Sequence, residues 1–422
     1  MDRLNELTWY AIAYGWIAGA AIFGIAAAWL LAPTSRRAWL PIMRLRPGAW
    51  IGRDTFFVFC VYHGLPMVIT ATLFQMGFFT PLIGPAPDRS ALTDSAIYIN
   101  RCQNIASPLG FTLTLGTIFF ILYARSGTRP HHFGLSWTRL WPNVGLGLVA
   151  SIGAIPLVIG LHTVVQFVLP GRDHSLTTLS KLVRNDWEWW FIGFQVVIVA
   201  PVMEEIVFRG LIQGWLRRAS LSGHLIVCVI VVLFGLMVFA EKAALVVAPT
   251  EDVKVENKAP ADGKQAATRP VTVIDYIAPG VVALLLVGGY AWLMVRIILQ
   301  FELREGEIQH WQLAPLEESL APQAGLSEED ARECRRIACE QEELRQRDWS
   351  NANAQMAWFG TAMLFAMVHY GVWPAPIPLM PLGLIFGWLA WRTQSLIAPI
   401  VLHAVFNLTS FIALYGTVME SR

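Results

Sequence analysis

Charged residues are scarce in this chain. Only 14% of the 422 residues are Asp, Glu, Lys or Arg, and 55% are apolar, whereas average soluble domains carry about 25% charged residues. The formal net charge is +1 at pH 7, so the composition gives no basic surface of the kind that binds nucleic acids. Low charge combined with repeated apolar runs of roughly 20 residues predicts a polytopic membrane protein.

Several motifs of soluble hydrolases and transport ATPases are also missing. Of the five cysteines, Cys334 and Cys339 lie in a charged helical stretch with no matching Cys or His pair, so neither a zinc finger nor a disulfide framework is indicated. There is no H-E-x-x-H, which excludes a zincin helix, and no G-x-S-x-G nucleophile elbow. There is no G-x-x-x-x-G-K-[ST] either, so ATP-driven transport is not indicated.

Ten apolar segments have the lengths of membrane spans. We therefore expect an all-α, polytopic transmembrane helical bundle of about ten spans, with an eight-span-like core and one inserted pair. The segments are 9–31, 55–79, 105–124, 143–169, 188–212, 223–248, 273–299, 354–371, 377–392 and 396–416. The first is too long for the apolar part of a signal peptide, so we expect it to be retained.

The distribution of arginines predicts the orientation of these spans. Arginines concentrate in alternate loops, which places those loops in the cytoplasm and both termini outside. We expect a multi-pass integral protein of a bacterial cytoplasmic membrane.

Four regions are expected along the chain. Residues 1–187 would form N-terminal transmembrane helices, and 188–218 would form a helix that carries the first polar motif. Residues 219–353 would be an insertion with two spans and a charged cytoplasmic helix, which either connects the spans or docks a partner. Residues 354–416 would carry the remaining motifs.

Three polar motifs lie inside these apolar segments, where ionisable groups are costly and default to a functional role. Counted at 1.5 Å per residue from the nearest predicted cytoplasmic residue, the three motifs fall within about 8 Å of one depth. Together they supply a carboxylate base, imidazoles and an amide donor, which peptide-bond hydrolysis requires. The motif residues are Glu204, Glu205 and Arg209; Phe365 and His369; and His403 and Asn407.

The spacing within the first motif separates its two carboxylates. Glu205 and Arg209 are four residues apart and can pair on one helix face. Glu204 is displaced by about 100° on an α-helix and is free to accept a proton. The same residues could instead form a buried ion-pair cluster that locks two helices, and a lone intramembrane His such as His403 could simply hydrogen-bond a neighbouring helix.

The order E-E-x-x-x-R, F-x-x-x-H, H-x-x-x-N, with Phe208-Arg209-Gly210 in the first motif, resembles the CPBP family. That family includes the type II CAAX prenyl endopeptidase, a glutamate-type intramembrane protease, and bacteriocin-immunity and lysostaphin resistance protein A-like relatives. The resemblance covers roughly 188–218 and 354–411.

This resemblance implies an intramembrane endopeptidase of the kind that performs CAAX processing. It implies that Glu204, with His369, activates the attacking water. It also implies that His403 and Asn407 stabilise the oxyanion of the tetrahedral intermediate. The partners that it implies for this protein are membrane lipid and a membrane-associated protein or peptide substrate, with no nucleic acid.

The resemblance assigns Glu205 and Arg209 to shaping the site and leaves the cofactor open between none and zinc. No metal ligand is assigned. If the protein is a metalloendopeptidase, the candidate ligands are Glu204, His369 and His403, because two imidazoles and a carboxylate can bind zinc with one open position.

Two other functions remain open on the sequence. The chain could be a catalytically silent immunity or scaffold membrane protein of the same family. It could also be a proton-coupled secondary transporter that uses Glu204 and the histidines as a relay. One departure from the family pattern concerns substrate access: residues 210–364 separate the first motif from the second, where a few dozen residues are usual.

Overall fold

The computed structural model describes residues 50, 52–85, 92–135, 139–169, 183, 186–217, 221–247, 273–311 and 353–421. Within these ranges the chain is all-helical and contains no strand, as predicted. The expected first span at 9–31 lies outside the described residues, and so do residues 312–352, the part of the predicted region 219–353 in which the charged cytoplasmic helix was expected.

Most of the described chain belongs to long helices. These are α2 (Gly52–Gln75), α4 (Leu92–Ser126), α5 (Leu140–Val168), α10 (Leu221–Val247), α11 (Val273–Trp311) and α15 (Ile397–Ser421). Shorter elements are α3 (Thr80–Ile83), η2 (Pro130–Phe133), η5 (Tyr370–Val372), α14 (Pro376–Thr393) and a helix over 353–368. The helix that carries the first motif is built from α7 (Asp186–Phe194), η3 (Gln195–Val199), α8 (Ala200–Glu204), η4 (Glu205–Ile212) and α9 (Gln213–Leu216).

The predicted second to tenth spans all coincide with helices, but the count of about ten spans is not confirmed. Six helices in the described part are long and apolar enough to cross a membrane: Asp54–Gln75, Arg101–Ser126, Leu140–Val168, Trp187–Leu216, Gly280–Ile297 and Ile397–Met419. The helix over 353–368 is short for this, because its 16 residues rise only about 24 Å against a hydrocarbon core of about 30 Å.

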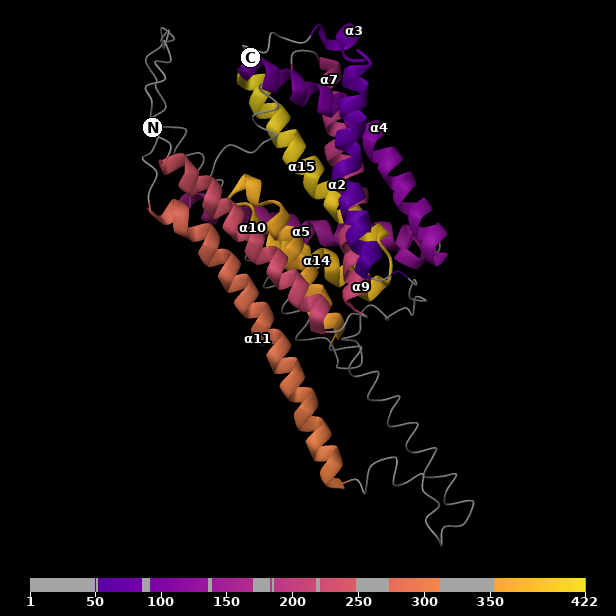
Figure 1. The fold of residues 1–422 in the computed structure, drawn as a ribbon, viewed down its shortest axis with the longest axis vertical. Coiled ribbons are helices and arrows are strands. Elements are labelled where there is room, and N and C mark those ends of the chain that lie inside the picture. Colours follow the sequence, from indigo (N-terminus) through magenta and orange to yellow (C-terminus); the bar gives the residue numbers. More distant parts are fainter. Residues whose placement is uncertain are drawn as a thin grey trace.

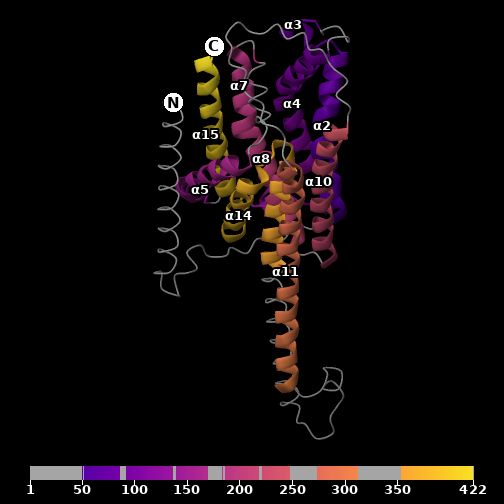
Figure 2. The ribbon, with the colours of Figure 1, turned by 90° about the vertical axis from the view of Figure 1, so that its left-hand side faces the viewer.

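The helices pack in neighbouring pairs around the motif helix. Helix α2 lies along α4, α5 packs against both α14 and α15, and α10 lies along α11. Helix α11 runs beside α10 and continues beyond the end of every other labelled helix (Figure 1, Figure 2). The main apolar core joins residues of the motif helix, the helix over 353–368, α14, α10 and α11.

A buried polar link fixes the helix over 353–368, which ends one residue before His369, against the motif helix. The His224 ring in α10 is fully buried, with Nδ1 2.5 Å from the Tyr290 hydroxyl and Nε2 2.7 Å from Asn353 Oδ1. Asn353 Nδ2 donates to the carbonyl of Arg217 at 2.9 Å. Because Asn353 starts one helix and Arg217 ends the other, this link sets the relative depth of the first two motifs.

Candidate active site

The first motif lies on a helix with two π-helical stretches. Both η3 and η4 are π-helical, and α8 is a single α-helical turn between them that ends at Glu204. Such π turns are rare and occur frequently at functional sites, where they change which side chains face inward. Nothing in the apolar periodicity of the sequence predicts them.

The three motifs converge on the carboxylate of Glu204. Its Oε2 atom lies 4.0 Å from Nε2 of His369 and 3.9 Å from Nε2 of His403. Within the described residues, Glu204 Oε2 is buried and has no hydrogen-bond partner. Separations near 4 Å are too long for direct hydrogen bonds, and they suit two groups that contact one small molecule between them. Tyr62, from α2, is also within electrostatic range of Glu204.

Glu205 is held in a different way, as its spacing from Arg209 predicts. Arg209 donates from one terminal guanidinium nitrogen to Glu205 Oε1 at 3.1 Å, and both side chains are fully buried. The same carboxylate oxygen lies 3.0 Å from Nδ1 of His403. A carboxylate accepts only, so we assign the Nδ1 proton of His403 to this bond. Glu205 therefore orients His403 and balances the charge of Arg209.

Aromatic rings fix the buried part of this cluster. The Arg209 guanidinium carbon lies 4.2 Å from the centre of the Phe365 ring and 4.9 Å from that of Phe386. The His403 ring stacks on Phe386 at 4.7 Å between centroids. Cation–π and stacking contacts of this kind restrict the rotamers of both polar side chains.

His369 presents a free lone pair towards Glu204. Its Nδ1 lies 2.8 Å from the carbonyl oxygen of Phe365, an acceptor, so we assign the ring proton to Nδ1 and the lone pair to Nε2. The side chains of His369 and Glu204 are 31% and 16% exposed, whereas that of His403 is 5% exposed. The accessible face of the cluster is therefore the one formed by Glu204 and His369.

Asn407 is bound to the backbone of the motif helix. Its Nδ2 donates to the carbonyl of Val196 at 2.8 Å. The N–H of Ala200 goes to Gln195 instead, and Pro201 has no N–H to give. The π turn thus leaves the Val196 carbonyl for the Asn407 side chain. One N–H of the Asn407 amide is used there, and the other is not engaged in that bond.

Two contacts to α14 escaped the sequence interpretation. Arg209 donates to the carbonyl of Gly383 at 3.3 Å, and Gln213 Nε2 donates to that of Gly387 at 3.1 Å. The two donors are four residues apart on the motif helix, and the two acceptors are four residues apart on α14. Each polar side chain therefore reaches one glycine of the Gly-x-x-x-Gly pair. That shared spacing of four is a signal by which the contacts could have been found.

The geometry does not form a recognisable metal site. No group of three His, Cys, Asp or Glu side chains among the described residues is placed to hold one ion. Ligand atoms around a tetrahedral zinc with bonds of about 2.0–2.1 Å are roughly 3.3 Å apart. The separations of 3.9 and 4.0 Å between Glu204 and the two imidazoles are wider than that.

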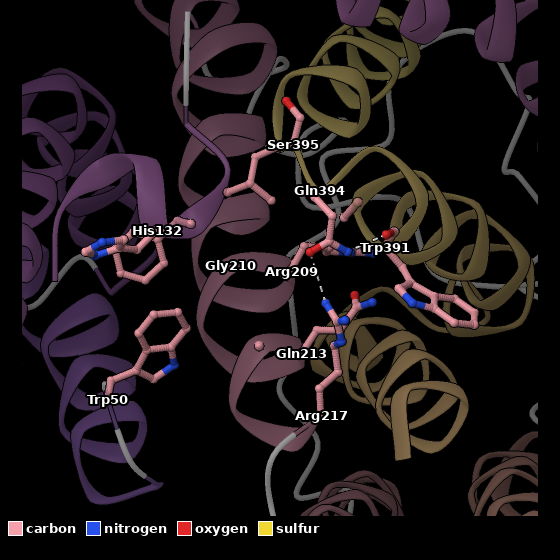
Figure 3. Close-up of a pocket in the computed structure, with 13 residues that line it drawn as sticks. Trp50, His132, Arg209, Gly210, Gln213, Arg217, Trp391, Gln394 and Ser395 are labelled. Atoms are coloured by element: carbon pink, nitrogen blue, oxygen red, sulfur yellow. Dashed lines mark hydrogen bonds between the residues drawn. The ribbon is translucent and has the colours of Figure 1, made fainter. Parts of the chain in front are cut away.

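A partly open cavity of about 270 Å³ lies further along the same helix (Figure 3). It is lined by Arg209, Gln213 and Arg217 of the motif helix and by residues around the end of α14. Neither Glu204 nor the two motif histidines line it. The cavity is therefore a feature separate from the cluster around Glu204, with Arg209 between them.

Comparison with protein families gives a match to the part of the chain that carries the motifs. A family model described as "Type II CAAX prenyl endopeptidase Rce1-like" matches residues 186–301 and 334–409. The two segments contain all three motifs together with α10 and most of α11, and residues 302–333 lie between them. No curated protein and no solved structure gives a significant match to the chain.

Proposed function

Because the chain belongs to the Rce1-like family of type II CAAX prenyl endopeptidases, we propose that it is an intramembrane endopeptidase that uses Glu204 and His369 to activate water. The observation that carries the proposal is the position of Glu204 Oε2, 4.0 Å from His369 Nε2 and 3.9 Å from His403 Nε2. A water molecule can hydrogen-bond Glu204 and His369 together across such a separation.

The reaction follows from the accessible face of the cluster. Glu204 takes a proton from the water held between it and His369 Nε2, and the water oxygen bonds to the carbonyl carbon of the peptide. The carbonyl π electrons move to oxygen and form the tetrahedral oxyanion. When the C–N bond breaks, Glu204 returns the proton to the leaving nitrogen, so the carboxylate is regenerated.

The oxyanion is stabilised by donors on α15 in this proposal. Nδ1–H of His403 is directed at Glu205, so His403 can also donate from Nε2 only as an imidazolium. With Glu204 and Glu205 ionised, Arg209 charged and His403 protonated, the cluster carries no net charge. The second N–H of the Asn407 amide is the other candidate donor. Preorganised donors of this type contribute about 2.7–4 kcal/mol to transition-state stabilisation.

We propose membrane-associated polypeptides as the substrate class. The catalytic cluster lies in the middle of an apolar stretch, Trp187–Leu216, so a scissile bond must approach it from the membrane or its surface. The name of the family refers to CAAX prenyl substrates, and a lipid-modified C-terminal segment would bring a peptide bond to this position.

The test uses purified protein and does not require the substrate to be known in advance. Wild type and Glu204→Gln, which keeps the side-chain volume and removes the base, are each incubated with membranes from cells that lack the protein. New peptide N-termini are then counted by mass spectrometry. We expect cleavage by wild type and a loss of two or more orders of magnitude in the variant, since acid–base catalysis contributes about 10²–10⁴-fold. If wild type produces no new termini, the protein is a silent scaffold and the peptidase proposal fails. Equal cleavage by both proteins would instead remove Glu204 from the mechanism.

A further inference from the structure

The cavity beside α9 is basic and contains no acid. Arg209, Arg217 and His132 line it, and none of its thirteen lining residues is Asp or Glu. Arg209, Gln213 and Arg217 enter from successive turns of one helix, while Trp391 and Gln394 lie opposite (Figure 3). Any charged ligand of this cavity is therefore an anion.

Arg217 is the cation with the weakest protein partner there. Its guanidinium makes one long bond of 3.4 Å to Gln394 Oε1, and it pairs with no carboxylate among the described residues. Burial lowers the pKa of Arg217 below its ordinary value, so the surroundings disfavour its charge. Arg209, in contrast, is balanced by Glu205. Arg217 is partly buried, and a cation withdrawn from water without a counterion is costly, so an anionic ligand would offset that cost.

The cavity also lies where a membrane surface is expected. The apolar stretch of the motif helix ends at Leu216, one residue before Arg217. Trp50 and Trp391 line the cavity, and tryptophans concentrate at the level of lipid headgroups. In the proposed orientation this is the cytoplasmic leaflet, which contains the anionic lipids. The volume of about 270 Å³ is close to the small end of ligand sites, about 300–1,000 Å³, which suits a headgroup.

We propose that this cavity binds the phosphate group of an anionic phospholipid headgroup, with Arg217 as its principal contact. The phosphate oxygens would accept charge-assisted hydrogen bonds from the guanidinium. The site does not depend on peptidase activity, so its test reads binding alone.

The test measures lipid binding to delipidated protein in neutral detergent by native mass spectrometry. The probes are dioleoyl phosphatidylglycerol and, as the lipid without net charge, dioleoyl phosphatidylcholine. We expect preferential binding of phosphatidylglycerol to wild type, and about tenfold weaker binding to Arg217→Gln. The matched control is Arg296→Gln, because Arg296 is an exposed arginine near the end of the apolar stretch Gly280–Ile297 and does not line the cavity. It should bind like wild type.

Further arms identify the source of the anion and guard against misfolding. Arg217→Lys keeps the charge and should retain part of the affinity, and phosphatidylglycerol should raise the thermal unfolding temperature of wild type more than that of Arg217→Gln. Equal binding of both lipids, or equal losses in the position 217 and 296 variants, would overturn the proposal. So would displacement of the lipid by millimolar inorganic phosphate, which would indicate a free-phosphate site. Displacement by a peptide with a free C-terminal carboxylate, but not by its amide, would likewise replace the lipid with a substrate terminus.

Discussion

Glu204 and Glu205 are adjacent in sequence, but their surroundings differ. Glu205 shares one carboxylate oxygen between Arg209 and His403 and is fully buried. Glu204 faces the two imidazole Nε2 atoms at a distance that leaves room for a reactant. In the proposed mechanism, Glu205 is therefore the structural carboxylate and Glu204 the one that transfers the proton.

This difference predicts that the same substitution, Glu to Gln, affects stability at one position and not at the other. Glu205→Gln keeps the volume but leaves Arg209 buried without its counterion, which should lower the free energy of unfolding by about 3–5 kcal/mol. Glu204→Gln should leave it nearly unchanged while abolishing cleavage. Thermal unfolding of both purified variants in one detergent, beside wild type, checks this. Equal unfolding temperatures for the two variants would contradict the assignment of roles.

The metal-free mechanism has its own prediction. Zinc is measured by elemental analysis in purified wild type, His369→Ala and His403→Ala. We expect no stoichiometric zinc in any of them, and no effect of chelators on cleavage, because Glu204 Oε2 lies farther from each imidazole Nε2 than ligand atoms around zinc lie from one another. One zinc per wild-type chain, lost in both variants, would make the protein a zinc peptidase.

At the residue scale, the sequence predicted which side chains meet but not all of their partners. The pairing of Glu205 with Arg209 follows from a spacing of four and is confirmed. The bond from Asn407 to Val196 was not predictable, because it depends on a π turn and on Pro201. The catalytic role of Asn407 remains a prediction.

At the scale of elements, close helix contact positions the cluster. Gly383 and Gly387 of α14 let that helix approach the motif helix and the helix over 353–368 closely enough for their carbonyls to accept from Arg209 and Gln213. Trp358 also donates to the Leu384 carbonyl at 2.6 Å, which holds its ring in place. The residues that form the site are thus braced by a helix that contributes no catalytic group.

We predict that Gly387→Ala destabilises the protein by about 1–3 kcal/mol, as overpacking in a core typically does. A Cβ at this position would lie 2.7 Å from Trp358 Cδ1 and 3.1 Å from Gln213 Oε1. Gly116→Ala in α4 is the control, since a Cβ there meets nothing within 4 Å. It should be neutral or slightly stabilising, because Ala favours helix. The measurement is the thermal unfolding temperature of the two variants. Similar temperatures would show that the contact of position 387 with Trp358 and Gln213 is not tight.

Helix positions were predicted well and helix lengths less well. Nine of the predicted apolar segments coincide with helices. Segment positions are predictable because a helix surface that is buried, whether in lipid or in the protein core, consists of apolar residues. Length was harder to predict, since α4 begins at Leu92 and its apolar part only at Arg101, and α11 continues to Trp311. Polar extensions of this kind are stable because the helix is already formed, and apolar windows do not reveal them.

At the scale of the whole molecule, the arrangement of motifs, helices and loops must agree with one orientation in the membrane. The family match spans α10 and most of α11, so the part of 219–353 that falls outside both matched segments is 302–333. The assignment of 219–353 as an insertion remains a prediction. If α11 leads out of the membrane on the side of Arg217, the segment that follows it belongs to the cytoplasm.

This orientation predicts opposite labelling of two cysteines introduced into a Cys-free background. Met76, at the end of α2, is 76% exposed and should lie outside. Ser327, which is beyond the described residues, should lie in the cytoplasm with the charged segment. A membrane-impermeant maleimide applied to intact cells should therefore label Met76→Cys and not Ser327→Cys, whereas both should react after the cells are broken. The reverse pattern would invert the topology. Because α2 begins beside Trp50 at the cavity and ends one residue before Met76, it would also move the proposed lipid cavity at Arg217 to the outer leaflet.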